Sequence, residues 1–419
     1  MGHDWKQKRI VLILVLVLLP AGACVRKNLH GNPTEETQVA EHPMDIYGRA
    51  GTGAFYAPFH FSVDPMERLL LVNIEKDPDR LYVAFEPQWV DDDKTGHGLL
   101  VIAYRVDGFV DVYYEPGLSM AHKDFGIVGK GLAQQVETVF ERAVFEIGRL
   151  GLATDIAFRD REGRAIEVRI LEAGPKPPRP FSLLAPLGSA AEHPPSMPLF
   201  FVHDFYFVRK KGTEVHIAVD GRTHKPDGFP MPMDGTRIYF TRYSGAPLIV
   251  AWNESFHGPV EAHGPVGALH RVGDTEYELV HRDDHVEIAA MRAGSGPRSV
   301  TITFEPAVPD IPALRDGVSV EGRFEVVSEP PAGSVDGVYR IDRQGDEVVL
   351  RIHPDGGWKP DADRWMVGLI YRMAAIFREW PKTYVWTGRM ALDGDEGPTL
   401  EAGWTRVPKG TVLTGDGHP

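Results

Sequence analysis

Histidine and glutamate side chains gather in one short stretch of the second half, Trp252–Gly264, which reads WNESFHGPVEAHG. It holds Glu254, His257 and His263 among glycine and proline, residue types that favour turns. Imidazole and carboxylate groups are common acids and bases in enzymes, and histidine also binds Zn²⁺. These three residues are therefore the candidate catalytic groups, and His270 could join them around zinc. The simpler interpretation is a set of ordinary surface histidines.

A second group of candidates lies just before this stretch, in TRIYFTRYS at 236–244. Its residues alternate as in a strand, and tyrosine combines an apolar ring with a polar tip, which suits a binding surface. The candidate ligand-binding residues are Tyr239, Arg242, Tyr243 and Trp252. An apolar or glycan-like small molecule fits this mixture of rings and donors. A strand face turned to solvent is the alternative.

Motifs that would name a reaction are absent. The sequence contains no GxSxG, HExxH, CxxC or GxxxxGK[ST]. We therefore predict no cofactor and no metal site, and whether the chain is an enzyme stays open. The formal net charge is −14, and no basic patch with interleaved aromatic residues is present, so nucleic acid is not expected as a partner.

The only cysteine of the 419 residues is Cys24. It follows a positive stretch with Lys6, Lys8 and Arg9, ten apolar residues at 10–19, and small residues. This order is typical of a secretory signal peptide, and the apolar run is short for a membrane span. The stretch ending Ala-Gly-Ala-Cys resembles the lipobox of bacterial lipoproteins.

That resemblance implies cleavage before Cys24 and attachment of acyl chains to its side chain. The expected partner is then the membrane, reached through these chains, and the expected location is the cell envelope. Val25 in the next position implies the outer membrane if the host has two membranes. A plain secretory signal with an incidental cysteine is the alternative.

Alternation of apolar and polar residues dominates the remainder of the chain. We expect a mainly β protein, with two successive antiparallel β-sandwich or lipocalin-like barrel domains, or one large super-sandwich, and one C-terminal helix. The expected units are a signal peptide at 1–23, a lipidated tether at 24–43, a β domain at 44–171, a proline-rich connector at 172–199, a second β domain at 200–404 and a tail at 405–419.

Several elements can be placed more closely. Apolar residues at helical spacing predict a helix over 361–380, capped by Asp361 or Asp363, and the stretch 131–150 suggests a short helix running into a strand. Asp107-Gly108 is typical of a type I′ hairpin turn. Strands are expected at 236–243 and 246–252, with a turn between them.

The order of the domains is similar to the paired lipocalin-like domains of carotenoid-hydratase-type proteins, without matching catalytic residues. Two classes of function remain open. One is a lipid-anchored binding protein for an apolar or glycan-like ligand. The other is an extracytoplasmic hydrolase, hydratase or isomerase that uses the histidine and glutamate residues near 252–270. A buried cluster of titratable groups around a cavity would favour the enzyme.

Overall fold

A computed structural model describes residues 42–119, 130–174, 176–186, 194–264, 266–362, 364–394 and 397–408. Cys24, the signal peptide and most of the tether and tail therefore lie outside the described residues. No helix in the described part of the chain combines the length and apolar character needed to cross a membrane.

Strands make up 60% of the structure and helices 6%, so the expectation of a mainly β protein is confirmed. The largest sheet is a ten-stranded antiparallel sheet. Its strands, in spatial order, are β16 (Phe256–Pro259), β26 (Thr399–Arg406), β25 (Tyr384–Ala391), β24 (Glu347–Lys359), β23 (Ser334–Gln344), β22 (Ser319–Glu329), β21 (Arg298–Val308), β20 (His285–Ser295), β19 (Thr275–Arg282) and β18 (Leu269–Val272).

A nine-stranded sheet contains strands from both sides of the proline-rich stretch. Its order is β11 (Phe181–Ala185), β12 (Met197–Arg209), β15 (Ile238–Trp252), β3 (Met66–Asn73), β4 (Tyr82–Asp92), β5 (Gly96–Arg105), β6 (Val110–Tyr114) and β7 (Leu132–Glu137), while β2 (Phe61–Val63) also pairs with β15. Neighbours are antiparallel except β6 and β7, which are parallel.

Two smaller sheets complete the fold. The five-stranded sheet has the order β14 (Arg222–Thr223), β13 (Thr213–Val219), β10 (Ala165–Glu172), β9 (Gly151–Arg159) and β8 (Arg142–Gly148), and β1 (Phe55–Tyr56) pairs with β17 (Ala262–His263). Two 3-10 turns, η1 (Met44–Ile46) and η3 (Ile311–Ala313), lie beside the ten-stranded sheet and are joined by backbone bonds such as Arg315 N–H to Ile46 O, 2.7 Å.

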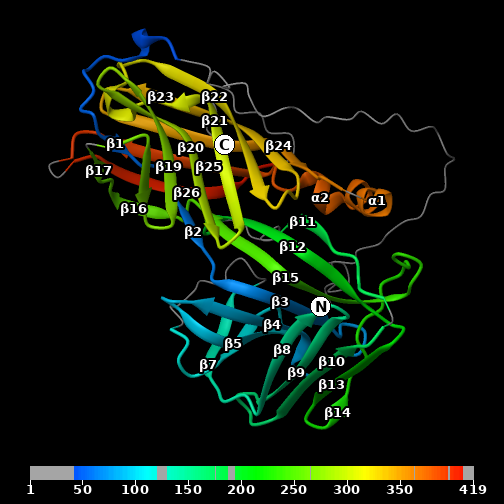
Figure 1. Ribbon diagram of the computed structural model, residues 1–419. Helices are drawn as coiled ribbons and strands as arrows, with labels where there is room; N and C mark the ends of the chain where they lie inside the picture. The colour runs from blue at the N-terminus through cyan, green and yellow to red at the C-terminus, as the bar shows by residue number, and fades with distance from the viewer. Residues whose placement is uncertain are drawn as a thin grey trace, which may run out of the picture.

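The nine-stranded sheet lies between the other two large sheets, with the ten-stranded sheet above it and the five-stranded sheet below it in Figure 1. One hydrophobic core joins the ten-stranded sheet to β11, β12 and part of β15, and a second joins β3–β5 to the five-stranded sheet. β15 serves both cores, because Tyr243 belongs to the second and Trp252 to the first.

The stretch 236–252 differs from expectation. Ile238–Trp252 forms one continuous strand of 15 residues, β15, and no turn occurs at Tyr243–Gly245. Its partner β12 is nearly as long, with the register running from Met197 opposite Trp252 to Arg209 opposite Ile238. The small residues Ser244 and Gly245 suggest a turn in isolation, but the chain stays extended because β12 pairs on both sides of Gly245, with Phe205 opposite Ser244 and His203 opposite Ala246.

Residues 131–150 also differ, since they form the strands β7 and β8 and contain no helix. The two-residue alternation of Ala143, Phe145 and Ile147 prevails over the helical stripe, and Phe145 is buried in the second core. The Asp107-Gly108 hairpin is present, but the connection spans four residues, 106–109, and only Gly108 has a positive φ, 89°. It is therefore not a type I′ turn, which requires two such residues.

The expected C-terminal helix is shorter and broken. It consists of α1 (Trp365–Met373) and α2 (Ala375–Glu379), separated by Ala374 in an extended conformation. Arg364 is the N-cap residue, with no side-chain capping bond, so the expected aspartate cap is wrong. The inner side of α1 holds Val367 and Tyr371, whose ring lies 4.9 Å from that of Trp358 in β24.

A buried carboxylate fastens the two lower sheets together. Glu172 at the end of β10 accepts the Tyr243 hydroxyl at 2.6 Å, the Arg209 Nε–H at 3.1 Å and the Leu152 backbone N–H at 3.1 Å. Burial and the adjacent Glu172 carboxylate raise the pKa of Tyr243. Its hydroxyl therefore stays protonated and donates a hydrogen bond to Glu172. These bonds fix the register where β9, β10, β12 and β15 meet.

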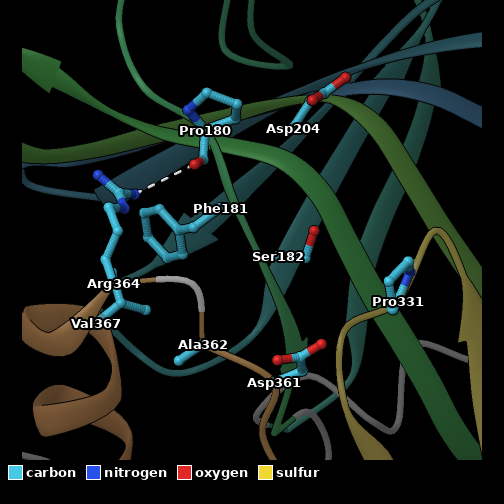
Figure 2. A pocket seen from close by; sticks show the side chains of 9 residues that line it. All are labelled: Pro180, Phe181, Ser182, Asp204, Pro331, Asp361, Ala362, Arg364 and Val367. Carbon is cyan, nitrogen blue, oxygen red and sulfur yellow. Dashed lines mark hydrogen bonds between the residues drawn. The ribbon is translucent and has the colours of Figure 1, made fainter. Parts of the chain in front are cut away.

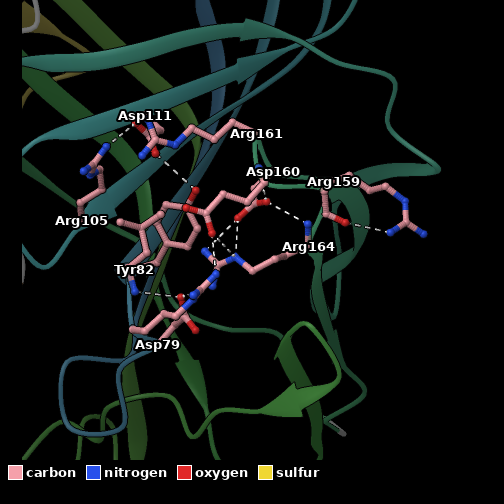
Figure 3. A network of polar contacts seen from close by, with 12 residues as sticks. Asp79, Tyr82, Arg105, Asp111, Arg159, Asp160, Arg161 and Arg164 are labelled. Carbon is pink, nitrogen blue, oxygen red and sulfur yellow. Dashed lines mark hydrogen bonds and ion pairs between the residues drawn. The ribbon is translucent and has the colours of Figure 1, made fainter.

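Charged groups occupy one end of the second core (Figure 3). Arg164 lies over the ring of Tyr82 and donates to Asp160 at 2.9 Å and to Asp79 at 2.8 Å. The Tyr82 hydroxyl in turn lies 3.3 Å from the fully buried Asp111 carboxylate. Since buried charges are costly unless paired, this network explains how charged residues close the end of an apolar core.

Replacement of Tyr243 by phenylalanine should destabilise the fold, because Glu172 loses a hydroxyl donor in a buried position. Hydrogen bonds to charged groups contribute about 1.5–3 kcal/mol, and we expect a loss of this size in the free energy of unfolding, measured by urea denaturation. Tyr239→Phe on the same strand, where the half-buried ring contacts Lys210, is the matched control and should change stability by less than about 0.5 kcal/mol. Equal effects of the two substitutions would contradict this role of Glu172.

Candidate functional site

A cleft opens where the edge of the nine-stranded sheet meets the start of α1 (Figure 2). It encloses a volume of about 150 Å³. Four segments that are distant in sequence line it: β11 with the residue before it, β12, the turn between β22 and β23, and the residues around the N-terminus of α1. The lining residues are Pro180, Phe181, Ser182, Asp204, Pro331, Asp361, Ala362, Arg364 and Val367.

Asp204 lines this cleft and has an unusual backbone conformation. Asp204 is exposed in the middle of β12 and has φ 44°, in the left-handed region that non-glycine residues rarely adopt. The hydrogen bonds between β12 and β15 are also irregular beside Asp204. There the Ser244 hydroxyl donates to the His203 carbonyl and accepts the Ala246 N–H at 3.2 Å. Strained backbone of this kind is concentrated at functional sites.

Arg364 forms one wall and ties the sheet edge to the helix. Its Nη1 lies 2.6 Å from the Asp234 carboxylate, its Nη2 donates to the Pro180 carbonyl at 3.3 Å, and its guanidinium lies 5.2 Å from the centre of the Phe181 ring. The charge of Arg364 is therefore balanced by Asp234. The carboxylates of Asp204 and Asp361 give the cleft its remaining charge, which is negative.

Ser182 lies between Asp204 and Asp361 in Figure 2, and its side chain contacts a histidine. Its Oγ is 3.3 Å from Nδ1 of His203, a residue that is only 2% exposed. Burial, with a contribution from the positive charge of Arg298, lowers the pKa of His203 to about 4. At neutral pH this imidazole is uncharged, so it can accept a hydrogen bond from Ser182.

This arrangement can recognise hydroxyl or ammonium groups. Two carboxylates and a serine hydroxyl accept hydrogen bonds, and Phe181 adds an apolar surface. A small polar ligand with several donors matches such a lining better than a purely apolar one.

Two of the sequence-predicted binding residues lie in the cores. Trp252 is fully buried against Phe324 and Trp404, with ring centres 5.3 and 5.5 Å away. Tyr243 is also fully buried, against Tyr206 and Glu172. The continuous strand β15 holds these two residues far apart, about 30 Å at the usual rise of a strand.

Arg242 lies on the opposite face of the sheet from Tyr243. It donates to Asn73 at 2.8 Å and its guanidinium lies over the Phe240 ring at 4.4 Å. Nearby, the Tyr104 hydroxyl donates to Glu86 at 2.5 Å, and burial raises the pKa of that carboxyl. Tyr239 is half-buried beneath Lys210, which lies 5.0 Å from its ring.

The candidate catalytic residues lie on different parts of the fold: His257 is on β16 at one edge of the ten-stranded sheet, Glu254 precedes that strand, and His263 is on β17, which pairs with β1. Glu254 and His257 are exposed, and His257 pairs with Glu401 on β26. His263 is half-buried against Phe55 and His270, with ring centres 5.4 and 5.5 Å away. Among the described residues, no group of three or more histidine, cysteine, aspartate or glutamate side chains is placed to hold a metal ion.

Sequence reasoning did not identify the residues of the cleft. Ser182 and Arg364 come together only in the folded chain, and no local pattern links them. Asp204 could have been recognised in the sequence, because the pair His203-Asp204 interrupts an otherwise uncharged, largely apolar run at 199–208. A charged residue within a strand buried on both faces indicates a special local environment.

The buried His203 should make stability depend on pH. Its folded-state pKa of about 4 lies below the ordinary 6.5, so the unfolded chain binds the extra proton between these values and stability falls as the pH drops through them. The free energy of unfolding should therefore fall by about 2 kcal/mol between pH 7.5 and pH 5. His203→Asn should remove that part of the pH dependence of the unfolding free energy, while His216→Asn on the exposed face of β13 should not. An unchanged pH profile in His203→Asn would refute the assignment.

Comparisons with known proteins give no family for the chain. No protein-family model matches the sequence, and no curated protein or solved structure is significantly similar to it. The function is therefore argued from the geometry of the cleft.

Proposed function

We propose that this chain is a lipid-anchored protein of the cell envelope that binds a small glycan-like ligand in the cleft between β11 and α1. The observation that carries the proposal is the lining: the carboxylates of Asp204 and Asp361 and the hydroxyl of Ser182 share one cleft with the ring of Phe181. Sugar hydroxyls donate to carboxylates, and the apolar face of a sugar ring packs on an aromatic side chain. The cleft volume of about 150 Å³ is similar to that of a protein cavity that holds one six-membered ring.

The anchor is supported by the sequence alone. Cys24 follows a positive stretch, an apolar run and three small residues. Acyl chains on Cys24 would hold the protein at a membrane, and the outer membrane is the proposed site in a host with two membranes.

For the fold, we propose that the two large hydrophobic cores belong to the two successive β domains expected from the sequence. The N-terminal domain is supported by the packing of β3–β5 on the five-stranded sheet. The C-terminal domain is supported by the packing of β15 on β20 and β21. In this arrangement β12 and β15 contribute to both domains.

A second candidate function is hydrolysis. The contact between Ser182 Oγ and His203 Nδ1 favours it, because a neutral imidazole can take the proton of a serine nucleophile. The low pKa of His203 makes it a weak base, so we place binding first. Catalysis by Glu254, His257 and His263 remains a separate prediction, and it would require a substrate to lie on the exposed edge strand β16.

Ligand binding can be tested by saturation-transfer NMR with glucose, galactose and N-acetylglucosamine, together with mass spectrometry of sugars that copurify. Asp204→Asn and Asp361→Asn should each weaken binding about tenfold, the equivalent of about 1.4 kcal/mol, because a charged acceptor is lost. Asparagine tolerates the left-handed backbone of Asp204, so the fold should survive.

The matched control is Asp283→Asn, on an exposed hairpin tip where φ is 50°. This substitution makes the same chemical change on the same type of backbone and should leave affinity unchanged. If no sugar binds or copurifies, or if all three variants bind equally well, the cleft is not a glycan site.

Lipidation is tested by Cys24→Ser, which should release the protein from membranes into the soluble fraction. Mass spectrometry of the wild-type protein should find acyl chains on an N-terminal residue 24. Val25→Ala is the control, and it should remain with the membranes. A mature N-terminus at any other residue would exclude the lipoprotein assignment.

A further inference from the structure

An apolar stripe lies on the outer side of α1. Trp365 is 77% exposed, Leu369 41% and Met373 37%. Residues spaced by four lie on one face of a helix, so the three side chains form a continuous stripe over the length of α1. Other exposed large apolar residues, such as Val139 between β7 and β8 and Leu269 on β18, lie elsewhere in the chain.

The stripe is not a core face that has failed to pack. The opposite side of α1 is already occupied, with Val367 2% and Tyr371 3% exposed. The Tyr371 ring packs on Trp358, and its hydroxyl donates to the Ser182 carbonyl at 2.7 Å. The orientation of α1 is therefore fixed, and Trp365, Leu369 and Met373 point away from the body. Figure 1 shows α1 and α2 at the side of the molecule, beyond the end of β24.

The charges within the two helices are mostly positive, in contrast to the chain as a whole. The two helices contain Arg372 and Arg378 but only one carboxylate, Glu379, while the whole chain has a net charge of −14. Both arginines are exposed, and Arg372 precedes Met373 at the border of the stripe. A negatively charged surface would repel most of this protein but attract this part of it.

We propose that the outer face of α1 docks on an anionic lipid surface, with Trp365, Leu369 and Met373 in the interface and Arg372 and Arg378 at the headgroups. A helix with an apolar stripe bordered by arginine has the features of interfacial helices. Tryptophan is also enriched at the level of the headgroups. This contact goes beyond the proposed ligand binding and does not depend on it.

The geometry is compatible with an anchor at Cys24. The described chain begins at His42, so 18 peptide steps separate the two residues, and at about 3.5 Å each they span at most about 60 Å. A covalent anchor at Cys24 does not by itself define which face of the body is turned to the membrane. The docking of α1 would select one orientation, with the cleft beside the membrane, because Arg364 and Val367 line the cleft and belong to the same helical region.

The test uses the full chain reconstituted in vesicles of phosphatidylethanolamine and phosphatidylglycerol, some carrying brominated acyl chains that quench tryptophan. The chain has eight tryptophans, so the share of Trp365 is obtained by comparison with Trp365→Phe. We expect Trp365 to be quenched in these vesicles and much less in phosphatidylcholine vesicles. Leu369→Glu should abolish most of that quenching, whereas Leu269→Glu, at a more exposed leucine on β18, should leave it intact.

Quenching that is absent, or that is the same in Leu369→Glu and the wild type, would overturn the proposal. Light scattering of the detergent-solubilised chain provides a second readout. If the stripe instead holds two copies of the chain together, the wild type would be dimeric and Leu369→Glu monomeric, and this result would also overturn it. Neither measurement involves a sugar, so failure here is distinguishable from failure of the glycan site.

Discussion

The buried carboxylate of Glu172 is the constraint on which the arrangement of the sheets depends. A charge in this position must be met by donors, because an unpaired buried ion is far more costly than a lost neutral contact. The donors come from three other strands: Leu152 from β9, Arg209 from β12 and Tyr243 from β15. Satisfying one side chain of β10 therefore fixes the nine-stranded sheet relative to the five-stranded sheet.

The cleft is a consequence of the length of β12. This strand extends beyond the second core to reach the first, and β11 covers only part of it at the sheet edge. Asp204 lies opposite β11, where the register of the two strands shifts, and its backbone conformation is one that regular pairing would not require. The helix α1 closes the other side through Arg364 and Tyr371, so the site exists only where a sheet edge and a helix from the far end of the chain meet.

Much of the fold could be predicted from alternation, because the side chains of a strand point to two faces with different surroundings. The strands β22, β23 and β24 show this clearly, with buried and exposed residues alternating. The length of a continuous strand, by contrast, could not be predicted from this alternation. Ser244 and Gly245 favour a turn locally, but Ser244 pairs with both β12 and β3 and Ala246 pairs with β12, so β15 continues through them. The candidate site was missed for a related reason, since Ser182, Asp204 and Arg364 are brought together by tertiary structure alone.

The pairing of β3 with β15 also bears on how the protein is made. Leu71 of β3 pairs with Arg242 of β15, so an N-terminal strand depends on one that is synthesised much later. A chain that emerges with its N-terminus first would expose the edge of β3 until β12 and β15 arrive, and open strand edges are templates for unwanted pairing. Non-local sheets of this type also form slowly. The unfinished chain would therefore benefit from a chaperone that covers this edge during synthesis.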